Sequence, residues 1–105
     1  MRLIVQASLA ASDVREQTDF LASRDAAIAL KFIEAIERAY RQIQENPSSG
    51  FCWNFTTKRL QGTRVKTVPG FRNQLIFFQE FPDSVRILRV LHASRDIAAI
   101  FRELS

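Results

Sequence analysis

The sequence is poor in the residues that build disulfides, metal centres and phosphate-binding loops. In 105 residues it has one cysteine, Cys52, and one histidine, His92, so an internal disulfide is impossible and a His/Cys metal cluster cannot be assembled. With only three glycines it lacks the glycine-rich motifs that hold nucleotide phosphates. It also lacks the G-x-S-x-G motif of a nucleophilic serine. We therefore expect no metal and no cofactor.

Long hydrophobic runs are missing too. Nowhere do about 18 apolar residues follow one another, and the first residues turn polar too early for a secretory signal. A lone cysteine fits a reducing compartment. These features predict a cytoplasmic protein that makes no contact with a membrane. The length and the 47% hydrophobic content are typical of one globular domain, residues 1–105.

The charge that is present is unevenly placed. The net charge is +4, and most of the excess lies in the second half of the chain. From Lys58 onward, only Glu80, Asp83, Asp96 and Glu103 oppose the basic residues Lys58, Arg59, Arg64, Lys66, Arg72, Arg86, Arg89, Arg95 and Arg102. This excess favours an acidic partner, either a nucleic acid or an acidic protein surface.

Hydrophobic periodicity predicts an α+β fold. The expected elements are a strand at Arg2–Gln6, helices at Leu9–Ala22 and Arg24–Glu45, strands at Arg64–Val68, Arg72–Phe81 and Val85–His92, and a helix at Ile97–Leu104. The two long helices form an antiparallel hairpin, and the last three strands form an antiparallel meander that the hairpin covers on one face. In the first helix, Ser8 is the expected N-cap and Asp13 lies on the exposed side.

The stretch from Ser84 to Asp96 is the centre of the predicted sheet. Its apolar run has hydrophobic residues on both faces, which is typical of an interior strand. In a regular strand, Arg89 would share a face with Ile87 and Leu91, and His92 would lie on the opposite face. A second apolar cluster, residues 51–55, either packs over the end of the sheet or forms a recognition surface.

The only dense set of polar residues is basic. We predict that it lines a groove on the sheet face that the helix hairpin leaves uncovered. The alternative is a solvated rim, in which Arg89 pairs with a carboxylate, Asp96 caps the last helix and His92 is a hydrogen-bonded structural residue. The basic set consists of Lys58, Arg59, Arg64, Lys66, Arg72, Arg89, His92 and Arg95.

Three pieces of the chain resemble the RelE/ParE superfamily of bacterial type II toxins. They are Asn46-Pro47 with Gly50, Gly70-Phe71-Arg72 leading into Leu75-Ile76-Phe77-Phe78, and Arg89-Val90-Leu91-His92 with Arg95-Asp96. The last piece is characteristic of the ParE-like branch, also described as plasmid stabilisation proteins. The resemblance covers nearly the whole chain. It implies a growth-inhibiting toxin that a cognate antitoxin neutralises in a hetero-oligomer.

The resemblance offers two targets. ParE-type members are associated with inhibition of DNA gyrase, and RelE-type members with cleavage of mRNA on the ribosome, commonly with a tyrosine near the carboxyl terminus. The one tyrosine here is Tyr40, on the apolar face of the long helix. This favours a gyrase-binding protein that is not an enzyme, in which the basic set and Asp96 contact the target or the antitoxin. The alternative is an mRNA endonuclease that uses Arg72, Arg89 and His92 at the phosphate.

Overall fold

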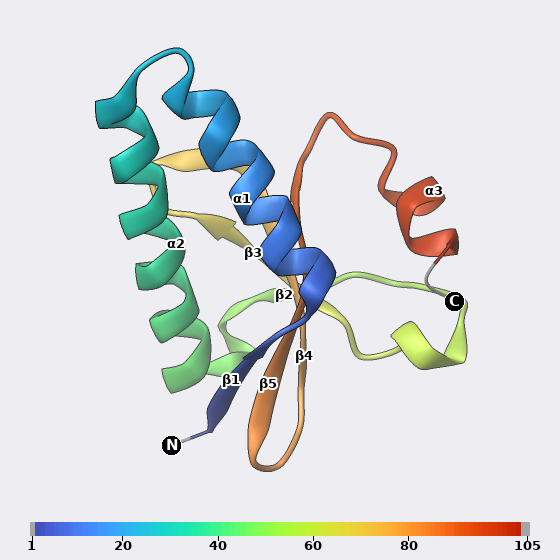
Figure 1. Ribbon diagram of the computed structural model, residues 1–105. Coiled ribbons are helices and arrows are strands. Elements are labelled where there is room, and N and C mark those ends of the chain that lie inside the picture. Colours follow the sequence, from blue (N-terminus) through green and yellow to red (C-terminus); the bar gives the residue numbers. More distant parts are fainter. Residues whose placement is uncertain (1, 104–105) are drawn as a thin grey trace.

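A five-stranded sheet runs through the middle of the molecule in the order β1-β5-β4-β3-β2 (Figure 1). The computed structural model describes residues 2–103. The strands are β1 (Leu3–Gln6), β2 (Phe51–Cys52), β3 (Arg64–Val68), β4 (Phe71–Glu80) and β5 (Ser84–His92). The helices are α1 (Ser8–Ala22), α2 (Ala26–Glu45) and α3 (Ile97–Arg102), with 3-10 turns η1 (Pro47–Ser49) and η2 (Lys58–Leu60).

These elements confirm the predicted α+β fold and the antiparallel meander of β3, β4 and β5. Two features of the sheet were not predicted: β2 adds an edge strand beside β3, and β1 runs parallel to β5. The N-cap of α1 is Ala7, not Ser8, and no side chain caps that end. The last helix ends at Arg102, and Leu104 lies outside the described residues.

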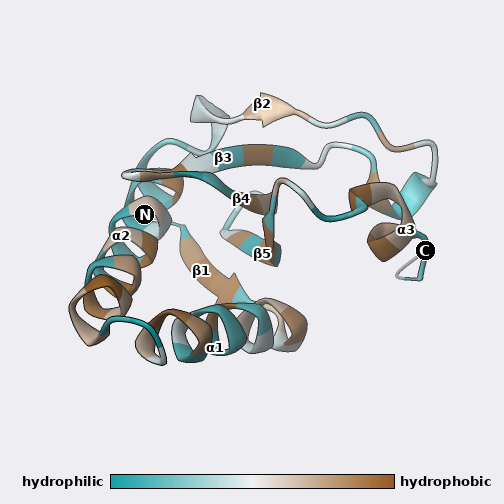
Figure 2. Ribbon diagram, turned by 90° about the horizontal axis from the view of Figure 1, so that it is seen from above, coloured by the Kyte–Doolittle hydropathy of each residue, from teal (hydrophilic) through white to brown (hydrophobic). Residues whose placement is uncertain are grey.

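Both faces of the sheet are covered by the chain itself. The helix-side core lies between α1, α2 and one face, and α3 with the 53–62 segment packs on the other face (Figures 1 and 2). The prediction that one face is left uncovered is therefore wrong for much of that face. We call the second layer the α3-side core; its buried members are Leu60, Val65, Phe77, Leu91, Ile97 and Phe101.

The aromatic cluster at residues 51–55 belongs largely to the α3-side core. Trp53 meets Phe77 edge to face at 5.3 Å between ring centroids, and Phe55 lies 4.7 Å from Phe101. Such aromatic pairs stabilise a core beyond the area that they bury. This confirms packing over the sheet for Trp53 and Phe55, whereas Phe51 stays exposed.

A β-bulge in β5 changes the face on which its later residues lie. The pairing with β4 passes from Ile87 to Arg89 and skips Leu88. Ile87 and Val90 consequently both enter the helix-side core, while Leu88 and Leu91 both join the α3-side core. The prediction that Ile87, Arg89 and Leu91 share one face is therefore wrong, because it assumed an unbroken alternation.

Asp13 of α1 binds β5 just after this bulge. Its two carboxylate oxygens accept hydrogen bonds from Arg89 Nε and Nη2, each at 2.7 Å, and Oδ2 also accepts from the Val90 N–H at 3.0 Å. Gln17 Nε2, one turn further along α1, donates to the Val90 carbonyl at 2.9 Å. Asp13 is buried, so its predicted place on the exposed side of the helix is wrong.

We expect Asp13→Ala to lower the free energy of unfolding by about 3 kcal/mol, because it leaves the Arg89 guanidinium and the Val90 N–H without a partner. Urea denaturation measures this loss. The double variant Asp13→Ala/Arg89→Ala removes the stranded charge, so it should lose less than the sum of the two single variants. Additive losses would show that the pair does not couple α1 to β5.

Gly50 allows the chain after η1 to approach the sheet closely. A Cβ at this position would lie 2.7 Å from the Val65 carbonyl oxygen and 3.0 Å from the Phe78 ring. We expect Gly50→Ala to destabilise the fold by about 1–3 kcal/mol, because the backbone of β3 or a core ring must shift. Thermal or urea unfolding measures the change, with the exposed neighbour variant Ser49→Ala as control. Equal stability of the two variants would contradict this account of the close approach.

Candidate functional site

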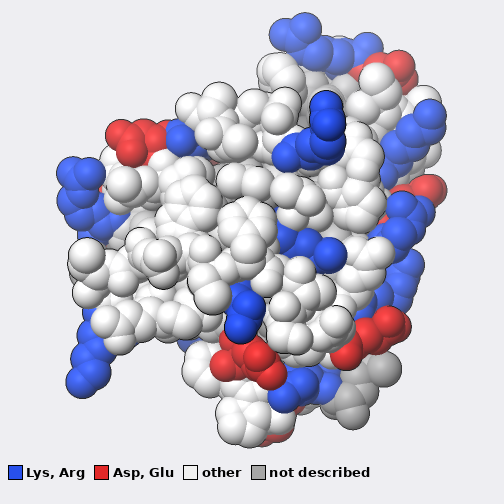
Figure 3. Space-filling view, turned by 180° about the vertical axis from the view of Figure 1, so that it is seen from behind, with Lys and Arg blue, Asp and Glu red and all other residues white. Residues whose placement is uncertain are grey.

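The predicted basic residues do not form one groove. Seen from the β2 side, basic side chains appear as separate patches among uncharged surface (Figure 3). Arg64 and Lys66 lie opposite Phe78 and Ile76 in the β3–β4 pairing, and both of these residues belong to the helix-side core. Because directly paired residues share a face, Arg64 and Lys66 lie on the helix-side face, not on the face predicted to be uncovered.

Arg89 is held in the structural pair with Asp13, as the alternative interpretation predicted. The hydrogen bonds to Asp13 raise the pKa of Arg89 above its ordinary value, so the guanidinium stays charged. Its side chain is only 13% exposed. Asp96 likewise fulfils the alternative prediction, because its carboxylate accepts the Ala99 N–H at 3.1 Å and so caps α3.

Arg72, His92 and Arg95 lie where β4 begins and β5 ends. We call these three residues the strand-end rim. Arg72 and His92 line a pocket of about 320 Å³ beside the β3–β4 turn, and His92 and Arg95 line one of about 620 Å³ against α1. The Ser94 N–H donates to His92 Nδ1 at 3.1 Å, so the neutral imidazole carries its proton on Nε2. The rim therefore presents hydrogen-bond donors at one end of the sheet.

The residues predicted for RNA cleavage are not gathered in one place. Arg72 and His92 share a pocket, but Arg89 lines a different one with Arg95 and residues of α3. Tyr40 is engaged in a structural contact: its hydroxyl accepts a hydrogen bond from Gln6 Nε2 at 2.7 Å, and burial raises the pKa of Tyr40. The geometry supplies part of a phosphate site without a complete acid–base set.

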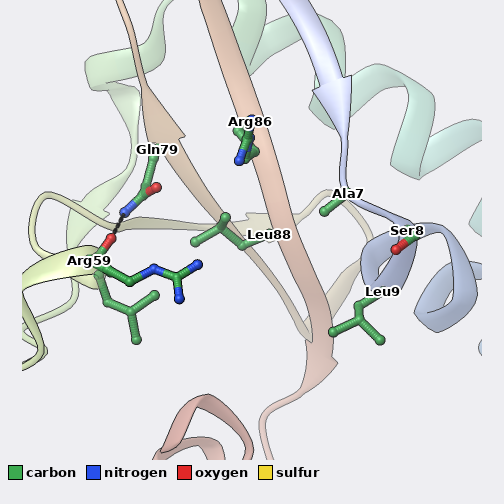
Figure 4. Close-up of a pocket in the computed structure, with 8 residues that line it drawn as sticks. Ala7, Ser8, Leu9, Arg59, Gln79, Arg86 and Leu88 are labelled. Carbon is green, nitrogen blue, oxygen red and sulfur yellow. Dashed lines mark hydrogen bonds between the residues drawn. The ribbon is translucent and has the colours of Figure 1, made fainter. Parts of the chain in front are cut away.

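A pocket that the sequence did not reveal opens on the same face as the α3-side core (Figure 4). It has a volume of about 310 Å³, and Arg59 and Arg86 both contribute to its walls. The other lining residues are Ala7, Ser8, Leu9, Leu60, Gln79 and Leu88. Arg59 was predicted as a binding residue, whereas Arg86 was placed on the same strand face as Leu88 but was not predicted to bind. The two-residue alternation of Arg86 with Leu88 was the one available signal that they share a face.

Among residues 2–103, no helix is long and apolar enough to cross a bilayer. The same part of the chain contains no group of three or more His, Cys, Asp or Glu side chains arranged to hold a metal ion.

Comparison with known proteins identifies the family. Residues 4–97 match the family model described as the ParE toxin of the type II toxin-antitoxin system, parDE. Among solved structures, the chain is similar to one from the chromosomal ParDE toxin–antitoxin system of P. aeruginosa, with 19% sequence identity and a TM-score of 0.70, over 88% of this chain and 96% of that one. No curated protein matches the sequence. The family match extends from β1 to the start of α3, and the chain therefore belongs to the ParE toxin family of type II toxin–antitoxin systems.

Proposed function

We propose that this protein inhibits growth by binding DNA gyrase, without cleaving RNA, and that a cognate antitoxin holds it inactive in a toxin–antitoxin hetero-oligomer. Membership of the ParE family supports this proposal, since gyrase inhibition is associated with ParE-type toxins. Gyrase acts in the cytoplasm, which is where we propose that the protein works.

The observation that carries the choice of target is the Asp13–Arg89 pair. RNA cleavage by a 2′-hydroxyl needs a base, an acid for the leaving oxygen and cations on the phosphate. The Arg89 guanidinium is bound on two nitrogens by Asp13, and releasing it would strand a buried carboxylate. Tyr40 is bound by Gln6 instead of facing a pocket with His92. A protein that acts by binding needs none of these groups to be free.

The strand-end rim is the surface that we propose for gyrase. The side chains of Arg72, His92 and Arg95 make no ion pair with any carboxylate of residues 2–103. The unpaired charges of Arg72 and Arg95 attract an acidic surface and speed the encounter with it. His92 and Arg95 also lie within the piece that resembles the ParE-like branch most closely, and Arg72 lies in a second piece of the same resemblance.

We expect the purified protein to inhibit DNA supercoiling by gyrase. The variant Arg72→Glu/Arg95→Glu should require a concentration about tenfold higher or more for half-maximal inhibition, because reversed rim charges repel an acidic partner. The matched control is Lys31→Glu/Arg38→Glu, which makes the same charge change on the exposed side of α2 and should inhibit like the wild type. Undiminished supercoiling in the presence of the wild-type protein would contradict gyrase as the target.

The shared pocket of Arg72 and His92 is the one observation that favours the endonuclease alternative. We expect no cleavage of mRNA when the protein is added to translating ribosomes. Primer extension on the recovered message measures this directly. Message cleaved by the wild type but left intact by His92→Gln would overturn the binding mechanism and make His92 a catalytic residue.

A further inference from the structure

We propose that the pocket between Arg59 and Arg86 is a carboxylate site, which receives an acidic side chain from an apolar segment of the antitoxin. This inference rests on the proposed function, because it assumes that the chain has such a partner. It adds the place of contact and the chemistry that the partner must supply. It also places this contact away from the strand-end rim.

The charges in the pocket are unbalanced. Neither Arg59 nor Arg86 forms an ion pair with a carboxylate of residues 2–103, and no Asp or Glu lines the pocket. The amino end of α1 forms another wall; its cap, Ala7, provides no side-chain acceptor, and its first turn has no acidic residue. The partial positive charge of a helix amino terminus adds to that of the guanidiniums. The pocket is therefore suited to an anion.

The backbone at both arginines is fixed, although their side chains are exposed. Arg86 lies directly opposite Gln79 in the β4–β5 pairing, and Gln79 Nε2 donates to the Arg59 carbonyl at 2.9 Å. In the same turn, the buried Thr63 hydroxyl donates a hydrogen bond to the Leu60 carbonyl at 2.6 Å. Figure 4 shows Arg59 reaching from this turn toward Leu88 on β5. An anchored backbone under each arginine lowers the entropy lost when a carboxylate binds both.

The residues around the two arginines favour a protein segment over a nucleic acid as the ligand of the pocket. Leu60 and Leu88 line the pocket together with the arginines, and Leu9 forms part of the wall with 44% of its surface exposed. These leucines form an apolar strip that continues along β1. There Leu3 and Val5 are 68% and 41% exposed, and Val5 is paired with Arg86. A nucleic-acid backbone offers no apolar group to such a strip. A peptide that alternates apolar and acidic residues can cover both the apolar strip and the two arginines.

The test is the affinity of the full-length toxin for the antitoxin that is encoded with it, measured by calorimetry. We expect Arg59→Glu/Arg86→Glu to weaken binding about 100-fold, and Arg59→Gln/Arg86→Gln about tenfold, with unchanged unfolding curves. The control Lys31→Glu/Arg38→Glu should bind like the wild type. Replacing each antitoxin Asp or Glu by Lys in turn should reveal one position that restores binding to the Arg59→Glu/Arg86→Glu toxin.

Three other outcomes overturn the inference in distinguishable ways. A wild-type toxin that does not bind the antitoxin refutes the proposed neutralisation, and this site with it. Wild-type binding that the Arg59/Arg86 variants retain in full refutes the site alone. Loss of binding to a short single-stranded RNA in these variants, with antitoxin binding intact, would assign the pocket to a nucleic acid. Gyrase inhibition by Arg59→Glu/Arg86→Glu should equal that of the wild type, since the strand-end rim is unchanged.

Discussion

The hydrogen bonds that α1 makes to Val90 determine how the helix hairpin meets the sheet. β1 is four residues long, and its pairing with β5 ends at Ile87. Beyond that point the edge of β5 would expose unpaired backbone groups, which is costly next to a core. Asp13 accepts the Val90 N–H, and Gln17 donates to the Val90 carbonyl. Side chains of α1 thus take the place of the strand that β1 does not continue.

This arrangement matters because α1 buries few of its apolar side chains completely. Among its apolar side chains only Ala10 is fully buried, whereas α2 buries six residues against the sheet. A buried ion pair is a weak source of stability, since desolvation offsets most of the attraction. What the Asp13–Arg89 pair supplies is position, because its two hydrogen bonds fit only one placement of the helix over β5. The same pairing leaves only 13% of the Arg89 side chain exposed.

The success of sequence reasoning varied with the regularity of each element. From Leu75 to Phe78 the residues of β4 follow the expected alternation, because Ile76 and Phe78 enter one core while Leu75 and Phe77 enter the other. The bulge in β5 leaves no mark in hydropathy, since Leu88 and Val90 are both apolar and can fill either core. Asp13 looks exposed on a helical wheel, and its partner lies 76 residues away. Tertiary packing determines both the pockets and the ion pairs between residues so far apart in the chain. No local sequence pattern encodes either of them.

The separation between the two proposed contact regions constrains any partner that blocks the toxin. Arg86 and His92 lie six positions apart on β5, which corresponds to about 20 Å along a strand. No single side chain spans that distance, and the bulge turns the later residues of β5 toward other faces than a regular strand would. A compact partner at the Arg59–Arg86 pocket would therefore leave the strand-end rim accessible. Simultaneous coverage of both requires an extended segment that follows β5 past the amino end of α1, where the exposed leucines lie.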